Sequence, residues 1–150
     1  MVARASAMVV AALLGLCACS SSVSVAPPEP AVDADTCADF MAALPDTLMD
    51  KASRPTDPAS DLTAAWGDPA ITVRCGVPDP AALTPTSQLI TIDGVDWLPE
   101  QTDGGYRFTT YDRVTNVEVD VPDDYSPEAD AATLLSPLVK DAVPAADSQH

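Results

Sequence analysis

Residues 70–75, with the sequence AITVRC, alternate apolar and polar side chains. Because successive side chains of an extended chain point to opposite faces, this segment separates its residues into two sets. The apolar set is Ile71, Val73 and Cys75, and the polar set is Thr72 and Arg74. The pattern predicts a strand with one buried face, on which Cys75 lies.

Further strands are predicted downstream, separated by tight-turn residues. The pair Asp93-Gly94 separates residues 89–92 from residues 95–98, and Asp-Gly is a strong signal for a two-residue hairpin turn. Asp103-Gly104-Gly105 then precedes a segment over 106–111. A last strand is predicted over 114–121, where Val117, Val119 and Val121 share one face and Glu118 and Asp120 the other. These short spacings are typical of an antiparallel meander.

Two helical regions flank these strands. Residues 37–44 place Cys37 and Phe40 on one face at helical spacing, and a further turn of helix is predicted near 46–51. Residues 51–69, which contain several Pro and Gly residues, are predicted to be mainly loop. The last helix is predicted to start at Ser126-Pro127-Glu128 and to kink or restart at Pro137. Its apolar stripe is Ala131, Leu134, Leu135 and Leu138.

Together these elements predict one small α+β domain over residues 36–143. Its sheet would be an antiparallel meander of about four or five strands, with both helices packed on one face. The chain of 150 residues leaves little room for a second domain. Residues 144–150 are predicted to be a frayed tail.

The N-terminus has the features of an export signal. Residues 7–18 carry no charge and follow Arg4, and they are too few for a membrane-spanning helix. Leu16-Cys17-Ala18-Cys19 resembles the cleavage box of bacterial lipoproteins, so residues 1–18 are predicted to be a signal peptide and Cys19 the lipidated residue. The alternatives are an ordinary cleaved signal with secretion and an uncleaved anchor.

Residues 19–35 are predicted to be a tether. The segment is rich in Ser and Pro, and such a chain stays extended without forming a core. At about 3.1 Å per residue, residues 20–35 could hold the domain up to roughly 50 Å from the membrane. Acyl chains on Cys19 would anchor the protein stably, because each buried methylene contributes about 0.8 kcal/mol.

Cleavage of the signal peptide would remove Cys17, and lipidation would modify Cys19. The thiols that remain are those of Cys37 and Cys75. Outside the cytoplasm, two thiols in a small domain usually pair, so a Cys37–Cys75 disulfide is predicted. The alternative is a reactive or metal-binding thiol, but neither cysteine has a neighbouring His or a CxxC partner.

The charge of the chain excludes several classes of partner. From Cys19 onward, six Lys and Arg residues face 23 Asp and Glu residues, which gives a formal net charge of −17. Such a surface repels nucleic acid and other polyanions. The only histidine is His150, and no phosphate-binding loop or zinc-ligand cluster is present, so no cofactor or metal is predicted. Calcium at Asp120, Asp123 and Asp124 is the open alternative to a solvated acidic surface.

Two functional hypotheses remain open. Trp66, Trp97 and Arg74 could line a cleft for a carboxylate or a sugar, although both tryptophans could equally belong to the core. Alternatively, a pair of carboxylates could act on a cell-wall sugar or peptide. The candidates for that pair are Asp93, Asp96, Asp123 and Asp124.

Several short motifs occur in an order that suggests a family. They are Leu44-Pro45, Ala65-Trp66-Gly67-Asp68-Pro69, Arg74-Cys75-Gly76-Val77 and Gly94-Val95-Asp96-Trp97, between Cys37 and Val139. With the lipidation box at Cys19, they resemble the actinobacterial lipoproteins grouped as domain of unknown function 3515. The resemblance implies an envelope lipoprotein and supplies no activity.

The sequence therefore predicts an extracytoplasmic lipoprotein on the outer face of the cell membrane. A non-enzymatic module that binds a protein or an envelope component is favoured, because the chain offers no usable catalytic base. The enzyme that uses two carboxylates is the alternative.

Overall fold

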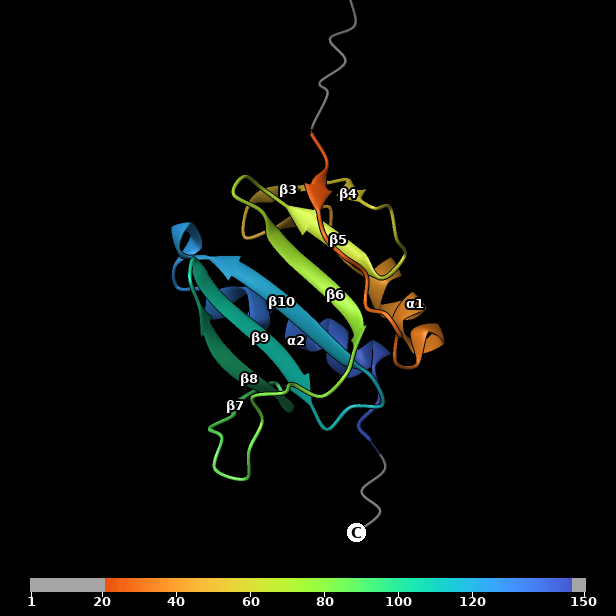
Figure 1. Cartoon of the computed structure of the whole chain (residues 1–150), viewed down its shortest axis with the longest axis vertical. Helices are drawn as coiled ribbons and strands as arrows, with labels where there is room; N and C mark the ends of the chain where they lie inside the picture. The colour runs from red at the N-terminus through yellow and green to blue at the C-terminus, as the bar shows by residue number, and fades with distance from the viewer. Residues whose placement is uncertain (1–20, 147–150) are drawn as a thin grey trace, which may run out of the picture.

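The computed structural model describes residues 21–146, which form an eight-stranded antiparallel sheet with two helices against one face (Figure 1). The strand order is β2-β3-β5-β6-β10-β9-β8-β7. The sheet consists of β2 (Thr47–Leu48), β3 (Lys51–Arg54), β5 (Thr63–Trp66), β6 (Ile71–Val77), β7 (Ile90–Ile92), β8 (Val95–Thr102), β9 (Gly105–Tyr111) and β10 (Asn116–Pro122). The helices are α1 (Ala34–Ala42) and α2 (Ala129–Ala142), and a short 3-10 helix, η1 (Asp123–Tyr125), follows β10.

The sheet consists of two antiparallel meanders joined at its centre. Strands β2, β3, β5 and β6 form the first meander and β7 to β10 form the second. The join is the antiparallel pairing of β10 with β6, in which Glu118 lies opposite Arg74. The α+β class, the antiparallel sheet and the single small domain are thus confirmed. The predicted number of strands was too low.

The missing strands lie where the sequence predicted helix or loop. Residues 46–51 were predicted to be helical, but β2 and β3 form a hairpin there. Met49 and Asp50 connect the two strands with φ angles of 49° and 63°, a turn conformation that a helix cannot contain. Residues 51–69, predicted to be mainly loop, contain β3, β5 and the two-residue strand β4 (Thr56–Asp57). These strands are too short for an alternating pattern to be recognised in the sequence.

Both helices cover one face of the sheet, as predicted. Helix α1 ends before Pro45, and α2 continues through Pro137 rather than restarting there. The residue that caps α2 is Glu128, not Ser126, and it makes no side-chain capping bond. The buried face of α2 is rotated from the predicted stripe, because Leu134 is 52% exposed. The buried residues are Ala131, Ala132, Leu135, Ser136 and Val139.

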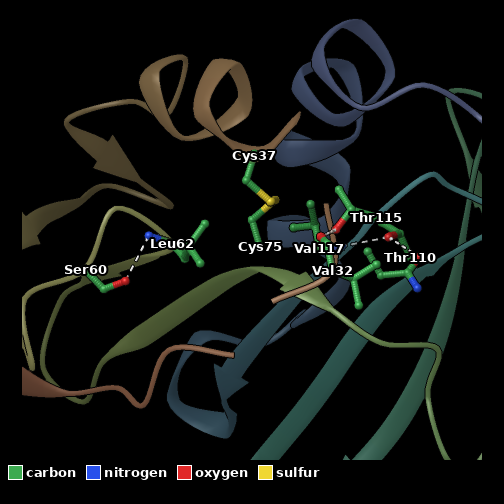
Figure 2. Close-up of a disulfide and its surroundings, with 9 residues drawn as sticks. Val32, Cys37, Ser60, Leu62, Cys75, Thr110, Thr115 and Val117 are labelled. Carbon is green, nitrogen blue, oxygen red and sulfur yellow. Dashed lines mark hydrogen bonds between the residues drawn. A yellow bond between two sulfur atoms is a disulfide. The ribbon is translucent and has the colours of Figure 1, made fainter. Parts of the chain in front are cut away.

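A disulfide joins α1 to the central strand β6. Cys37 and Cys75 form the predicted bond, and neither residue is exposed to solvent. Figure 2 shows Cys37 reaching from the helix toward the strand. Ile71 and Val73 are buried on the same face of β6 as Cys75, as the alternating pattern predicted. The bond therefore fastens a helix to the middle of the sheet at the centre of the core.

Residues 21–33, which we call the N-terminal arm, lie against the domain instead of forming a free tether. Strand β1 (Val23–Ser24) pairs with β4, and the arm then crosses in front of β5 in Figure 1. The backbone N–H of Val25 donates to Asp57 O, and that of Val32 donates to Gly76 O at 2.9 Å. The Thr115 hydroxyl donates to Val32 O beside the disulfide (Figure 2). The arm is extended as predicted, but backbone hydrogen bonds and the burial of Val25 attach it to the fold.

Gly76 allows the arm to approach β6 closely. Its φ is +96°, and a Cβ at this position would lie 3.3 Å from the Cβ of Ala31. The absence of a side chain therefore opens the space into which the arm packs.

The chain after α2 is also held. Val114 N–H donates to Pro144 O and Ala146 N–H donates to Asp112 O, so residues 144–146 are not frayed. Residues 1–20, which contain the predicted signal peptide and Cys19, and residues 147–150 lie outside the part that the structure describes. Between residues 21 and 146, no helix has the length and apolar character needed to cross a bilayer.

Candidate functional site

Both tryptophans belong to the core. Trp66 on β5 and Trp97 on β8 are at most 1% exposed. The indole N–H of Trp66 donates to Pro45 O at 3.0 Å, and that of Trp97 donates to the Ser136 hydroxyl of α2 at 2.9 Å. Each ring therefore fills space and satisfies its polar atom within the protein.

Arg74 lies on the opposite face of the sheet from the tryptophans. It alternates along β6 with the buried residues Val73 and Cys75, so its side chain points away from the helices. We call this side of the sheet the outer face. The predicted cleft that combines Trp66, Trp97 and Arg74 is therefore wrong, and the core interpretation of the tryptophans is correct.

Arg74 instead joins a charged cluster at the centre of the outer face. Its Nε and Nη2 atoms lie 2.8 and 2.7 Å from Oε1 of Glu118 on β10. On β9, Arg107 donates to both carboxylate oxygens of Asp120, from Nε at 2.8 Å and from Nη2 at 3.0 Å. The pairing of β6 with β10 and of β10 with β9 brings these four residues together.

The Arg107 guanidinium is held firmly in its charged form. The hydrogen bond to Asp120 raises its pKa above the ordinary value, and the negative charges of Glu118, Asp120 and Glu100 raise it further, whereas burial opposes the shift. Arg107 therefore remains a cation at neutral pH.

A cavity of about 260 Å³, which we call the outer cavity, lies over this cluster. Its floor is the sheet, with Arg74, Arg107, Thr109 and Glu118, and Glu100 of β8 also lines it. The loop of residues 78–82 forms the opposite wall and contributes Asp79. Asn116 positions that loop by donating from Nδ2 to Asp79 Oδ1 at 2.9 Å.

Glu118 is the most unusual group in the outer cavity. The residue is only 7% exposed, and Arg74 binds only one of its two oxygens closely. The other oxygen, Oε2, lies 3.5 Å from Arg107 Nε, which directs its hydrogen to Asp120 instead. Beside Glu118 in register lies Thr109, which is 2% exposed and whose hydroxyl makes no hydrogen bond with any residue between 21 and 146. The cavity floor thus offers acceptor atoms that the described protein does not use.

A second cavity of about 450 Å³ adjoins the first. The two share Arg74, Val77 and Pro78, and the N-terminal arm forms the other wall of the second cavity through residues 27–30 and Val32. We call it the arm cavity. Because the arm builds one of its walls, the docking of residues 21–33 shapes the candidate site.

A larger cavity, about 530 Å³, lies on the helix side between the end of α1 and β5. Its lining is mainly apolar, and the only charged residues that border it are Asp46 and Asp61. It lacks the converging charged and polar groups of the outer cavity, so it is the weaker candidate for a specific site.

The carboxylates that the sequence suggested for catalysis are not gathered at one place. Asp93 binds Lys140 at 3.1 Å, and Asp96 accepts a hydrogen bond from Thr91. Asp123 and Asp124 are exposed in η1, and Asp120 of the calcium hypothesis is bound to Arg107. Over residues 21–146, no three acidic, His or Cys side chains are grouped so that they could hold a metal ion.

The comparison with protein families gives one match. A family described as "Protein of unknown function (DUF3515)" matches residues 2–148, nearly the whole chain. This chain is a member of the DUF3515 family. No curated protein and no solved structure matched it.

The family description assigns no activity, so the function of this DUF3515 protein has to be argued from its site. The sequence analysis identified Arg74 but missed its partner Glu118, the neighbouring Arg107 and the loop of residues 78–82. The available signal was the position of Glu118 between Val117 and Val119, in a strand otherwise rich in valine. A charged residue in such a strand can pair with an opposite charge directly across from it on a neighbouring strand.

Proposed function

We propose that this chain is a lipid-anchored protein on the outer face of the cell membrane and acts as a non-enzymatic binding module through the outer cavity. The observation that carries the proposal is the incompletely paired Glu118 carboxylate. Buried charges are costly unless they are fully hydrogen-bonded, and exceptions concentrate at functional sites. Over residues 21–146, every fully buried polar side-chain atom has a hydrogen-bond partner, so the unused acceptor capacity of Glu118 faces the outer cavity.

The proposed location is supported by the lipidation box and by the disulfide. Buried structural disulfides form and persist mainly in oxidising compartments outside the cytoplasm. The Cys37–Cys75 bond lies in the core, where it stabilises the fold rather than serving as a reactive group.

The N-terminal arm would hold the domain close to the membrane. Arg54 on β3 donates to Ser21 O from Nη2 at 2.8 Å and from Nε at 3.3 Å. Only Ser20 separates Ser21 from Cys19, so the free linker would span about 7 Å instead of 50 Å. The end of the domain that contains β3 and the β1–β4 pair would then face the bilayer.

The proposed anchoring and binding can be tested together in living cells. The chain purified from membranes should carry a diacylglyceryl group on Cys19, detected by mass spectrometry, and Cys19→Ala should lose it. A photo-crosslinking residue at Ala81, on the wall of the outer cavity, should give a specific adduct. The matched control places the same group at Leu134, which is exposed on the helix side. An unmodified Cys19, or equal labelling from both positions, would contradict the proposal.

The docking of the arm gives a separate prediction. Thr115→Val removes the hydroxyl that donates to Val32 O, and one such hydrogen bond contributes about 1 kcal/mol. We expect amide hydrogen exchange at Val32, whose N–H binds Gly76 O, to become about fivefold faster. The control is Thr133→Val, because the Thr133 hydroxyl binds only Ala129 of its own helix. Unchanged exchange at Val32 would mean that other contacts hold the arm.

A further inference from the structure

We infer that the outer cavity recognises an ammonium group on its ligand. This inference rests on the proposed binding function and specifies its chemistry. The anchoring atom is Oε2 of Glu118, with the Thr109 hydroxyl beside it and the Glu100 carboxylate on the same side of the sheet.

The floor of the outer cavity has unused hydrogen-bonding capacity. Glu118 Oε1 accepts two close contacts from Arg74, whereas Oε2 has only the 3.5 Å contact with Arg107. A carboxylate oxygen on the floor of a cavity is best satisfied by a charged N–H donor, because charge-assisted hydrogen bonds are roughly twice as strong as neutral ones. An ammonium group has three donors and no acceptor, so it can bind Glu118 and the neighbouring Thr109 together, while Glu100 adds negative charge to the same cavity.

The charge balance of the outer cavity favours a cation. Three carboxylates line the cavity, those of Asp79, Glu100 and Glu118, against the two guanidiniums of Arg74 and Arg107. Asp120 already neutralises most of the charge of Arg107. The chain as a whole carries a formal charge of −16, so its field attracts cations and repels anions.

The outer cavity is small and continues into the arm cavity. A volume of about 260 Å³ is below the usual range for an entire drug-sized ligand, so the outer cavity suits one end group. The arm cavity continues from it past Arg74 and Val77 and can receive the rest of a longer molecule. The ligand would thus extend along the proline-rich arm, with its ammonium end over Glu118.

The test uses three sugars that differ in one group. Glucosamine carries an ammonium group, N-acetylglucosamine carries a neutral amide, and glucuronate carries a carboxylate. Each is titrated into the ¹⁵N-labelled full chain in detergent micelles, and backbone amide shifts are followed by NMR. We expect glucosamine alone to shift the amides of Arg74, Thr109 and Glu118.

Variants then identify the group that binds. Glu118→Gln should weaken glucosamine binding at least about tenfold, because it replaces a charge-assisted hydrogen bond by a neutral one. Since this change also leaves Arg74 without its ionic partner, Glu100→Gln and Thr109→Val serve as second variants that keep the Arg74–Glu118 pair. The matched control is Asp96→Asn, which removes the same charge from β8 outside the cavity and should leave binding unchanged.

The outcomes separate this inference from the proposed function. Equal shifts with all three sugars, shifts with glucuronate alone, or shifts distant from the outer cavity would overturn the ammonium assignment. So would the absence of any shift. In each of these cases, a specific adduct from position 81 would leave the binding function standing, because the crosslink does not depend on the charge of the ligand.

Discussion

Replacing Cys37 and Cys75 together with alanine should lower the free energy of unfolding by about 3–4 kcal/mol. The two cysteines are 38 residues apart, and in the loop-closure account a bond over this separation reduces the entropy of the unfolded chain by that amount. Because the bond fastens α1 to the central strand of the sheet, we expect one cooperative loss of stability rather than detachment of the helix alone. The measurement is urea unfolding followed by circular dichroism.

Reductant provides the control for this prediction. Unfolding of the wild-type chain in the presence of dithiothreitol should give the same loss, since the bond is then absent from the unfolded state. The double variant should show the same stability with and without reductant. A midpoint in the double variant equal to that of the oxidised wild type would show that the bond contributes nothing to the fold.

Gly105→Ala should be comparably damaging, with a loss of about 3 kcal/mol or more. A Cβ at Gly105 would lie 2.0 Å from Val121 O and 2.9 Å from Pro122 Cα, and its φ of +155° disfavours other residues. Both obstacles are backbone atoms of β10, so the only relief is to separate the strands. Overpacking typically costs about 1–3 kcal/mol, and backbone strain adds about 1–3 kcal/mol.

Gly104 is the matched control for this substitution. A Cβ at Gly104 would meet nothing within 4 Å, so Gly104→Ala should change stability by no more than about 0.5 kcal/mol. Thermal unfolding of the two variants, which differ only by one position in the same turn, measures the contrast. Similar melting temperatures for Gly105→Ala and Gly104→Ala would mean that the end of the β9–β10 pair can open without a loss of stability.

The local sequence pattern was sufficient to predict the strands in which apolar and polar residues alternate over several positions. The alternation over 70–75 predicted β6 with the correct buried face, and the valines at 117, 119 and 121 predicted the buried side of β10. The Cys37–Cys75 bond was predicted because the export signal places the domain outside the cytoplasm, where two remaining thiols usually pair. In the two strands, residues two positions apart already carry the information, because side-chain direction in a strand follows from backbone geometry.

Short strands and the arm could not be predicted in this way. Strands β2 and β4 have two residues each, so no period can be recognised in them. A helix was predicted at 46–51 because Met49, which has a positive φ, is not a residue type that signals a turn. The arm consists of serines and prolines that form no core of their own, and it is held by partners such as Asp57, Gly76 and Thr115.

The sequence by itself determined the acidic character, the cysteine pair, the α+β class and the side of each long strand that is buried. Only the tertiary structure decided which charged groups meet. Arg74 and Glu118 are 44 residues apart, and they become partners because β10 returns to pair with β6 instead of remaining at the edge of its own meander. That pairing depends on how the whole sheet closes over the helices. A contact between distant strands is set by the burial of the entire core, which no local pattern contains.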